Sequence, residues 1–348
     1  MPIYAIIGNP PYQLTVAKKD TENGQKAVIN IFQHFQTLAD NLAPRFSSFI
    51  YPAGRWIHRS GKGLADFGYR QINDARLARI HFFPESADIF QDVGIADGLS
   101  IVFKDREKNK GGFTYAYTKG GETIEVQMFN PGEVLMALNP MAEKISQKIQ
   151  AFVQKDFDYI FNSVLPRSLF SIESDFVEKN PDLVRPYQEG EVLSNDEIKL
   201  FTNDKAGKAG RANWYVANKA VITTGIEQLY RWKVVVSSAN AGGQKRSNQI
   251  AVLDNRSAFG RSRVALKTFD TEEEAVNFYT YCQTDFIRYA FLLTDEALTS
   301  LGKLVPDLLN YRNENGLIDY SEDVNEQLYT LFGINEEMQT IIRKTLAE

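Results

Sequence analysis

A short segment near residue 10, Asn9-Pro10-Pro11-Tyr12, combines residue types that could hold an amino group. Two successive prolines fix φ at about −65° and remove two backbone donors, so the carbonyl of Pro10 stays free to accept a hydrogen bond. The side-chain carbonyl of Asn9 is a second neutral acceptor, and the ring of Tyr12 is a flat face on which a base could stack. These residue types at this spacing predict a site that holds an exocyclic amine between two acceptors.

Such a site suits methyl transfer to the amino nitrogen of a base. The N6 lone pair of adenine is delocalised into the ring, and two acceptors that hold both N–H bonds favour the pyramidal form that attacks a sulfonium methyl in line. This chemistry needs no strong base and no metal. A base within a duplex must first be flipped out, and stacking on Tyr12 offsets part of an unstacking cost of roughly a few kcal/mol. The competing interpretation is an ordinary strand-ending turn, because Asn and Pro are common turn residues.

The elements around this segment indicate an α/β arrangement. The apolar run Ile3-Tyr4-Ala5-Ile6-Ile7 predicts a short buried strand of the parallel-sheet type, and open α/β sheets bind ligands at the carboxyl ends of their strands. Apolar spacing then predicts a helix over 27–42 and a strand over 46–52. Further strands are expected at 78–83, 99–103, 113–117 and 123–129, with a helix over 141–153. Residues 1–155 are therefore expected to form an α/β half-domain.

The chain resembles the gamma-type adenine-N6 DNA methyltransferases of restriction-modification systems, above all the fused methylases of type IIG. The segments that carry the resemblance are Gly8-Asn9-Pro10-Pro11-Tyr12, Tyr51-Pro52-Ala53-Gly54-Arg55-Trp56, Gly61-Lys62-Gly63-Leu64 with Phe67, and Leu99-Ser100-Ile101-Val102-Phe103-Lys104. Gly54 and Gly68 depart from the family pattern. The resemblance covers most of the chain and implies a partial Rossmann-like methyltransferase half-domain followed by a mixed α+β target-recognition domain.

The resemblance also implies roles for individual residues. Asn9, Pro10, Pro11 and Tyr12 would be the catalytic residues, and Phe103 would join Tyr12 in stacking on the flipped base. Because an aromatic residue in an apolar strand is more commonly part of the core, packing is the alternative role of Phe103. The resemblance implies Lys62 as a DNA contact, S-adenosyl-L-methionine as the cofactor and double-stranded DNA as the partner.

The order of motifs departs from that of complete enzymes of this kind. In the family, the half that binds the methyl donor usually precedes the Asn-Pro-Pro-Tyr loop, whereas only residues 1–8 precede it here. No Asp/Glu-x-Phe-x-Gly-x-Gly donor loop follows it, and the glycines at 242–243 and 260 lack a strand-to-helix switch. We therefore expect the acceptor half of an enzyme whose donor site lies largely outside this chain, on an upstream methyltransferase or nuclease half or subunit.

A second group of chemically informative residues lies between residues 237 and 263. Strand-like segments at 232–236, 250–253 and 264–269 flank a loop rich in Ser, Ala, Asn and Gly. The candidate DNA contacts in and beside this loop are Lys245, Arg246, Asn248, Arg261 and Arg263. Such side chains bind phosphates and read base edges, although a solvated loop would have the same composition. Residues 156–348 are expected to form a mixed α+β target-recognition domain, with helices capped at Thr271 and divided at Gly333.

Composition limits the remaining choices. The 348 residues are 43% hydrophobic and 12% aromatic, which is typical of a globular protein of about two domains. The net charge is −5, but DNA affinity depends on local presentation of Lys and Arg rather than on the total. The single Cys282 excludes an internal disulfide and suits a reducing cytoplasm, and one Cys with three scattered His excludes a zinc site of ordinary spacing. No apolar stretch approaches the ~20 residues of a membrane span.

Three functions stay open at this point. The first is a site-specific, S-adenosyl-L-methionine-dependent DNA adenine-N6 methyltransferase of a restriction-modification system, with this chain as its carboxyl-terminal part and inactive on its own. The second is a methyltransferase that acts on another amine, either a protein glutamine or an RNA guanine, because the same loop occurs in such enzymes. The third is a non-catalytic DNA-recognition subunit, whose duplex binding would not depend on Asn9 or Tyr12.

Overall fold

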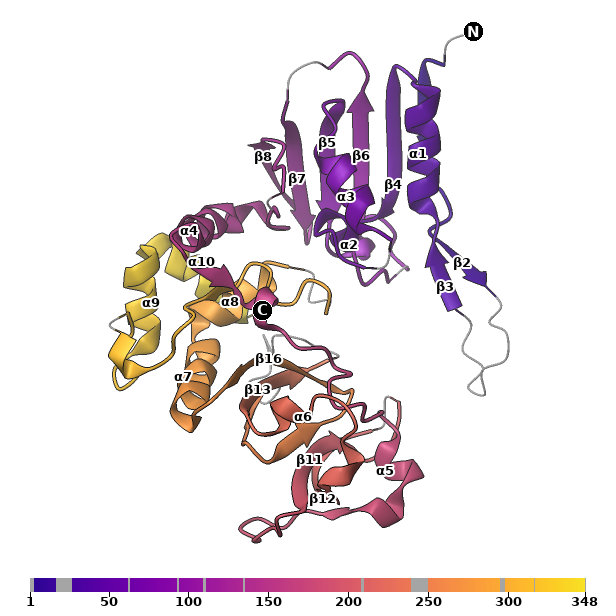
Figure 1. Ribbon diagram of the computed structural model, residues 1–348. Coiled ribbons are helices and arrows are strands. Elements are labelled where there is room, and N and C mark those ends of the chain that lie inside the picture. The colour runs from indigo at the N-terminus through magenta and orange to yellow at the C-terminus, as the bar shows by residue number, and fades with distance from the viewer. Residues whose placement is uncertain are drawn as a thin grey trace. The chain divides into compact units, whose positions relative to one another are not determined.

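The structure is a computed structural model that describes residues 3–16, 27–61, 63–92, 94–108, 111–133, 135–207, 210–238, 250–294, 298–315 and 317–347. The chain divides into two compact units, Met1–Glu143 and Lys144–Glu348 (Figure 1). The division lies at the start of helix α4 (Glu143–Val153) rather than near residue 155, because Phe152 on this helix packs on Phe157 and Phe332 of the second unit. The assignment of the two units to catalysis and to target recognition stays a prediction.

A six-stranded mixed sheet forms the first unit, in the order β1-β4-β6-β5-β7-β8. Its strands are β1 (Ala5–Gly8), β4 (Phe46–Pro52), β6 (Leu99–Asp105), β5 (Leu77–Phe83), β7 (Phe113–Lys119) and β8 (Glu122–Met128). β1 runs parallel to β4 and β5 runs parallel to β7, whereas β6 is antiparallel to both of its neighbours. The carboxyl ends of β1, β4 and β5 therefore meet at one edge of the sheet. The α/β class predicted for this part of the chain is confirmed.

The helices of the first unit pack on one face of this sheet (Figure 1). They are α1 (Phe32–Leu42), α2 (Gly54–Ile57) and α3 (Ala65–Ile72), with the short 3-10 helices η1 (Ser86–Asp88) and η2 (Pro140–Ala142) elsewhere in the unit. In the core beneath them, Phe32 stacks on Tyr51 with 5.0 Å between ring centroids, and Phe67 contacts Tyr51 and Trp56 edge-on. These aromatic contacts join the three helices to β4 of the sheet.

A hairpin follows the Asn-Pro-Pro-Tyr segment. Strand β2 (Gln13–Val16) pairs antiparallel with β3 (Ala27–Asn30). The helix predicted over 27–42 therefore begins only at α1, and its expected first turn is an extended strand. Val28 and Ile29 are β-branched residues that favour a strand when a pairing partner is present, which the local spacing of apolar residues does not reveal.

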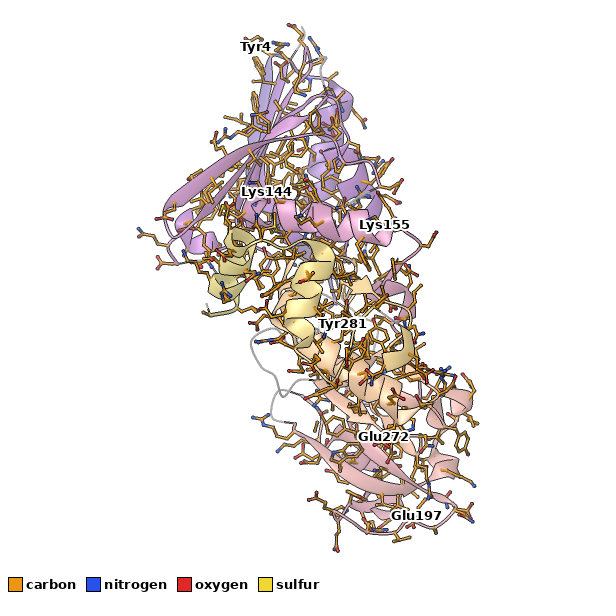
Figure 2. All side chains as sticks on the ribbon, turned by 90° about the vertical axis from the view of Figure 1, so that its left-hand side faces the viewer. Tyr4, Lys144, Lys155, Glu197, Glu272 and Tyr281 are labelled. Atoms are coloured by element: carbon orange, nitrogen blue, oxygen red, sulfur yellow. The ribbon has the colours of Figure 1, made fainter. Side chains whose placement is uncertain are left out.

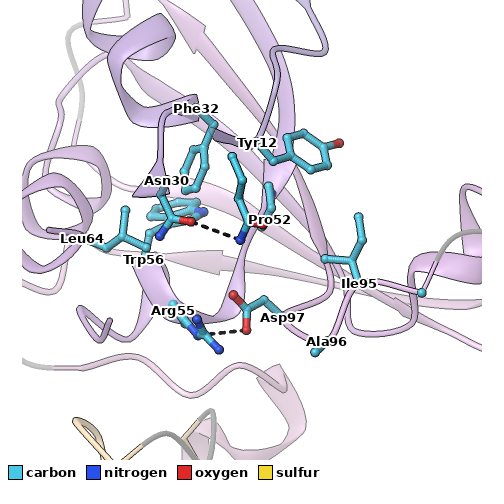
Figure 3. Close-up of a pocket in the computed structure, with 12 residues that line it drawn as sticks. Tyr12, Asn30, Phe32, Pro52, Arg55, Trp56, Leu64, Ile95, Ala96 and Asp97 are labelled. Carbon is cyan, nitrogen blue, oxygen red and sulfur yellow. Dashed lines mark hydrogen bonds and ion pairs between the residues drawn. The ribbon is translucent and has the colours of Figure 1, made fainter. Parts of the chain in front are cut away.

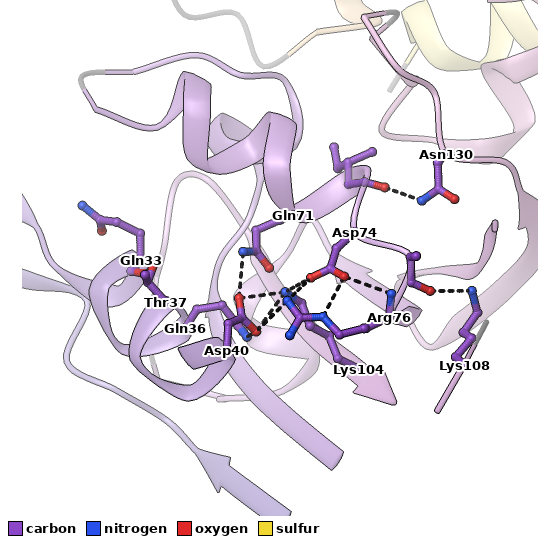
Figure 4. Close-up of polar contacts among 12 residues, drawn as sticks. Gln33, Gln36, Thr37, Asp40, Gln71, Asp74, Arg76, Lys104, Lys108 and Asn130 are labelled. Carbon is purple, nitrogen blue, oxygen red and sulfur yellow. Dashed lines mark hydrogen bonds and ion pairs between the residues drawn. The ribbon is translucent and has the colours of Figure 1, made fainter. Parts of the chain in front are cut away.

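A buried charged cluster joins α1, the end of α3 and β6 (Figure 4). The Nζ atom of Lys104, whose side chain is almost fully buried, lies 2.9 Å from Oδ2 of Asp40 and 2.8 Å from Oδ2 of Asp74. Gln71 donates to Asp40, and Arg76 donates to Asp74. Burial raises the pKa of Asp74, but the hydrogen bonds from Arg76 and the charge of Lys104 outweigh burial and hold this pKa far below its ordinary value. The cluster fixes one flank of α1 to β6.

Two small sheets form the centre of the second unit, in the orders β10-β12-β11-β15 and β14-β13-β16. Their strands are β10 (Val184–Pro186), β12 (Ala212–Asn218), β11 (Glu197–Asn203), β15 (Ser257–Phe259), β14 (Ile250–Leu253), β13 (Trp232–Ser237) and β16 (Arg263–Phe269). A separate pair consists of β9 (Asp158–Tyr159) and β17 (Pro306–Asp307). The short helices here are α5 (Phe176–Lys179), α6 (Ile226–Leu229), η3 (Ile160–Ser163), η4 (Pro181–Leu183), η5 (Lys219–Val221) and η7 (Asn313–Asn315). The predicted mix of strands and helices is observed in this unit.

Longer helices complete the second unit. They are α7 (Glu272–Gln283), α8 (Asp285–Leu292), α9 (Val324–Phe332) and α10 (Glu336–Ala347). The predicted cap at Thr271 is confirmed, because its side chain accepts from the amide of Glu274 at 3.3 Å. Gly333 ends α9 at a φ of 61°, as expected for a left-handed helix cap. Tyr281 of α7 is fully buried and donates to the carbonyl of Pro306 (Figure 2). None of the described helices combines the length and apolar character needed to cross a membrane.

Candidate active site

The Asn9-Pro10-Pro11-Tyr12 segment begins at the edge of the sheet where the parallel strands end. Gly8, the last residue of β1, pairs with Phe49 of β4, and a Cβ atom on Gly8 would lie 3.4 Å from the ring of Phe49. Pro10 is buried, whereas Asn9 and Pro11 are exposed. The amide of Ile31 donates to the carbonyl of Tyr12 at 3.0 Å. The segment is thus held between a strand end and the β2–β3 hairpin, at the place where open α/β sheets bind ligands.

Tyr12 is half-buried and packs against the core of the first unit. Burial raises the pKa of its hydroxyl, and the nearby side chain of Asn9 partly opposes this shift. The phenol is therefore neutral at physiological pH, and the carboxamide of Asn9 lies beside it. Two of the predicted catalytic residues are thus brought together, and a neutral Tyr12 suits a stacking role better than the role of a general base.

A cavity of about 270 Å³ opens beside Tyr12 (Figure 3). Its lining consists of Tyr12, Gln13, Asn30, Phe32, Pro52, Arg55, Trp56, Leu64, Gly94, Ile95, Ala96 and Asp97. Sites for drug-sized ligands have volumes of roughly 300–1,000 Å³, so a cavity just below this range suits a single base-sized ligand. Of the predicted catalytic residues, Tyr12 alone belongs to this described lining, and the residues from Asn9 to Pro11 precede it at the strand end.

The cavity lining combines three aromatic residues with two amide side chains and one ion pair. Trp56 is fully buried, and its Nε1 has no hydrogen-bond partner among the described residues. The amide of Gln13 donates to Oδ1 of Asn30 at 3.5 Å, across the base of the hairpin. Nε of Arg55 lies 3.1 Å from Oδ1 of Asp97, which closes one side with an ion pair (Figure 3). Aromatic rings with hydrogen-bonding groups beside them can match the faces and edges of a nucleobase.

Sequence reasoning did not assign a site role to most of these residues. Arg55 and Trp56 stand in one of the stretches that carry the family resemblance, so a signal for them was present. Asn30 and Asp97 are distant from the Asn-Pro-Pro-Tyr segment in the sequence and carry no motif of their own. They reach the cavity because the β2–β3 hairpin folds back on the segment and because the loop before β6 returns to the same edge of the sheet.

Phe103, the predicted second stacking residue, lies in another part of the first unit. It is opposite Ser48 in β4, whereas the edge of the sheet next to the cavity is marked by the pair Pro52 and Leu99. Its ring stacks on Phe46 with 5.8 Å between centroids. Phe103 is not part of the described cavity lining, so the structure does not bring it together with Tyr12.

The predicted DNA contacts are described only in part. Lys62, Lys245, Arg246 and Asn248 lie outside the described residues. Arg261 forms an ion pair with Glu173 at 3.2 Å. Arg263 begins β16 opposite Ser237, the last residue of β13, and therefore stands at the base of the loop that contains the predicted contacts. The structure thus places one predicted arginine beside that loop.

A row of aromatic rings and cations surrounds Arg263. Its guanidinium lies 4.7 Å from the ring centroid of Phe201, and burial lowers its pKa. Phe201 stacks on Trp214 with 4.8 Å between centroids, and Nζ of Lys199 lies 5.8 Å from the centre of the Trp214 ring. We call Phe201, Trp214, Lys199 and Arg263 the cation–aromatic row. Lys199 is ion-paired with Asp254, so Arg263 is the member of the row that supplies positive charge beside the aromatic faces.

No three His, Cys, Asp or Glu side chains in the described ranges lie close enough together to hold a metal ion. The described groups beside Tyr12 are of the kind that can hold and orient an amine.

Comparison with known proteins agrees with this arrangement. Residues 4–90 match the Eco57I restriction-modification methylase family. A protein of Mycoplasma pneumoniae described as an adenine-specific methylase is 27% identical over 144 residues, which are 41% of this chain and 33% of that protein. The matched family segment contains the Asn-Pro-Pro-Tyr loop and most of the cavity wall. The resemblance to restriction-modification adenine methylases is therefore confirmed.

Two solved structures match the chain over most of its length with low scores. The type IIL restriction-modification enzyme MmeI, determined in complex with DNA, has 11% sequence identity and a TM-score of 0.42, over 89% of this chain and 45% of that one. The type IIG restriction endonuclease BpuSI has 9% identity and a TM-score of 0.31, over 95% of this chain and 49% of that one. The chain thus spans a third of the methylase relative and about half of each of these enzymes.

Proposed function

We propose that the chain forms the target-amine and DNA-recognition part of a site-specific DNA adenine-N6 methyltransferase of a restriction-modification system. The observation that carries this proposal is the Asn9-Pro10-Pro11-Tyr12 segment at the carboxyl end of β1, next to a base-sized cavity. The family match over residues 4–90 supports it, because this range includes the segment and most of the cavity wall. The proposed methyl donor is S-adenosyl-L-methionine, which supplies an electrophilic methyl group when bound.

The proposed roles follow from the neutral character of the site. A flipped adenine rests on the ring of Tyr12, and the carbonyl of Pro10 and the side chain of Asn9 accept hydrogen bonds from its N6 amino group. Holding both N–H bonds localises the N6 lone pair and aims it at the incoming methyl group. The surplus proton of N6 passes to water after transfer, since none of these groups is a strong base.

The proposed DNA contacts lie mainly in the second unit. Arg263 and Arg261 supply positive charge near the loop, and Lys245, Arg246 and Asn248 of the loop supply further donors to phosphates and base edges. Lys62 is a proposed contact from the first unit. The cation–aromatic row supports this assignment, because it sets the guanidinium of Arg263 against an aromatic face.

The proposal assigns the binding of the methyl donor to polypeptide outside these 348 residues. The methylase relative extends well beyond the shared segment, which covers 33% of its length. We therefore propose that the chain acts as a fragment or subunit of the complete enzyme. It is inactive in methyl transfer until the donor-binding half is present.

The test is methylation of duplex DNA by the chain together with the polypeptide encoded directly upstream of it. Mass spectrometry of digested DNA detects N6-methyladenine. We expect Asn9→Ala to reduce methylation by about 100- to 1,000-fold, the loss typical for removal of one electrostatic contact to the reacting group. Binding of the duplex should be nearly unchanged, because Asn9 acts on the flipped base rather than on the DNA backbone.

The matched control is Asn213→Ala, which removes an exposed asparagine from β12 of the second unit. It should leave the methylation rate at the level of the unchanged protein. Methyl transfer only to protein or RNA would replace the proposal with an enzyme that acts on another amine. Salt-sensitive duplex binding with no methylation of any substrate would identify a DNA-recognition subunit instead.

A further inference from the structure

Two carboxamide side chains of the β2–β3 hairpin line the cavity beside Tyr12. Gln13 follows Tyr12 directly in the chain, and Asn30 is opposite Gln13 in the register of the hairpin. Both side chains belong to the described cavity lining (Figure 3). The roles proposed above for Asn9, Pro10 and Tyr12 use neither of them. The hairpin therefore brings to the cavity a pair of neutral hydrogen-bonding groups that the proposed reaction leaves unassigned.

The two carboxamides orient each other. Nε2 of Gln13 donates to Oδ1 of Asn30 at 3.5 Å, drawn as a dashed line in Figure 3. This contact uses the acceptor of Asn30, because a carboxamide carries its acceptor on oxygen and its donors on nitrogen. Within the described part of the chain, Nδ2 of Asn30 and Oε1 of Gln13 have no hydrogen-bond partner. The pair thus presents one unused donor and one unused acceptor.

The backbone around Asn30 is anchored on both sides. Nε2 of Gln33 donates to its carbonyl oxygen at 2.9 Å, and the amide of Ile31 donates to the carbonyl of Tyr12 at 3.0 Å. Phe32, which begins helix α1, is buried in the core. Asn30 itself is only half-buried. An anchored backbone with a reachable side chain suits a ligand contact, because little conformational freedom is lost when the ligand binds.

Asn30 is the best placed neutral donor in the described lining of this cavity. The hydroxyl of Tyr12 and the indole Nε1 of Trp56 are buried from solvent, and the guanidinium of Arg55 forms an ion pair with Asp97. A neutral donor also suits the proposed reaction. A cation against the ring would withdraw more electron density from the amine that must act as the nucleophile.

An adenine held as proposed above still lacks one contact. Stacking on an aromatic ring tolerates every base and every rotation in the plane of the ring, and Asn9 and Pro10 contact the amino group alone. The ring is then free to turn about N6. Adenine has an acceptor nitrogen on each side of its amino group, N1 on one edge and N7 on the other, and Asn side chains pair with such an edge when they read adenine in DNA.

We infer that Asn30, oriented by Gln13, donates a hydrogen bond from Nδ2 to one of the two ring nitrogens that flank the amino group of the target adenine. This contact fixes the rotation of the base in its plane and so aims the amine. It also contributes to the choice of base, because a base with an N–H group at that position would set two donors against each other. The inference rests on the proposed function, because it takes the cavity as the pocket for the flipped adenine.

The first test is NMR titration of the full isotope-labelled chain with 2′-deoxyadenosine, without DNA or methyl donor. The side-chain amide signals of Asn30, identified by their loss in Asn30→Asp, should shift when the nucleoside is added. The shift should be lost with one of two analogues, 1-deaza-2′-deoxyadenosine or 7-deaza-2′-deoxyadenosine, in which a C–H group replaces a ring nitrogen. The analogue that loses the shift identifies the nitrogen that is bound. No shift with 2′-deoxyadenosine, or equal shifts with all three nucleosides, would overturn the inference.

The second test is the rate of N6-methylation of a target duplex by the chain together with the polypeptide encoded upstream of it. Asn30→Ala and Asn30→Asp should each lower this rate by about fivefold to a hundredfold, the range expected when a ring acceptor loses its donor. Asn30→Asp keeps the size of the side chain and the acceptor for Gln13, so a comparable loss in both variants assigns the effect to the missing donor rather than to folding. The rate should be unchanged in Gln127→Ala, the matched control, which removes an exposed carboxamide that donates to Thr114 at 2.9 Å between β8 and β7.

A double substitution cycle separates contact from general damage. With the target adenine replaced by the analogue that loses the NMR shift, the unchanged protein should slow by about the same factor, and the Asn30 variants should slow little further. Fully additive losses, or Asn30 variants as active as Gln127→Ala, would overturn the inference.

Failure of this inference is distinguishable from failure of the proposed function. An Asn30 signal that shifts only when the ring nitrogen is present, in a protein that yields no N6-methyladenine with its upstream polypeptide, would support the contact and contradict the proposed reaction. Methylation that depends on Asn9 and is insensitive to both Asn30 variants would support the reaction and overturn the contact.

Discussion

The two units place a cation in different surroundings. In the first unit, Lys104 lies inside the protein between Asp40 and Asp74, and the lining of the cavity beside Tyr12 includes the ion pair of Arg55 with Asp97. In the second unit, Arg263 lies against an aromatic ring beside the predicted DNA-binding loop. The cations named in the first unit are therefore paired with carboxylates, whereas Arg263 has an aromatic partner.

The difference follows from the chemistry proposed for each region. A target amine that must keep its lone pair reactive is best held by neutral acceptors, because a strong acid nearby would protonate or withdraw that lone pair. Binding a nucleic-acid backbone instead requires positive charge, since phosphate contacts supply most of the affinity. The second unit also buries a lysine, Lys233, but surrounds it with backbone carbonyls rather than carboxylates.

Replacing Lys104 with Met should give the largest effect. The change leaves Asp40 and Asp74 buried without their shared cation, and breaking one partner of a buried ion pair costs about 3–5 kcal/mol of unfolding free energy. Hydrogen exchange of the β4 and β6 amides would measure the loss in the first unit. Lys219→Met, which removes an exposed lysine paired with Asp196, is the matched control and should leave this exchange unchanged. Equal exchange in both variants would show that the cluster does not stabilise the scaffold.

The free energy of unfolding of the second unit should depend on pH through the buried Lys233. Burial lowers the pKa of Lys233 to about 7 from 10.5, and the nearby carboxylate of Asp254 only partly opposes this. Between these two values the unfolded chain binds a proton that the folded chain lacks, so stability should rise with pH across this window, by roughly 1–4 kcal/mol. Below pH 7 Lys233 is protonated in both the folded and the unfolded state, so its contribution to stability no longer changes with pH. Urea unfolding at pH 7 and pH 10 measures the rise.

In Lys233→Met the part of the rise that comes from this lysine should disappear. The difference between the variant and the unchanged protein separates it from other groups that titrate in alkali. Parallel pH profiles for the two proteins would contradict the assignment and would indicate that the three backbone carbonyls around Nζ keep the lysine charged.

Replacing Arg263 with Ala should give the smallest of these effects. Loss of one phosphate contact is expected to weaken duplex binding by about tenfold, uniformly across sequences. The slope of the logarithm of the binding constant against the logarithm of the salt concentration should become shallower by about one. Fluorescence anisotropy over a range of salt concentrations measures both quantities. Arg185→Ala, which removes an arginine paired with Glu191 and Glu197, is the control. If Arg263→Ala leaves the dependence of the affinity on salt concentration unchanged, Arg263 does not contact a DNA phosphate.

The active segment and most strands of the first unit were predictable because their signals are local. Two prolines after an apolar run end a strand wherever they occur, and the predicted strands at 78–83 and 113–117 are found as β5 and β7. The first turn of the predicted helix over 27–42 was wrong, because β3 exists only through its pairing with β2. Local spacing contains no information on such a partner.

The predicted acceptor chemistry depends on the sequence alone, because Asn9, Pro10 and Tyr12 lie within four neighbouring residues. The caps at Thr271 and Gly333 are local in the same way, since each depends on one or two residues. The distant residues that line the cavity and the face of the sheet that Phe103 occupies are instead set by tertiary packing. These features depend on strand order and on the direction of β6, and both are set by packing between segments that lie far apart in the chain.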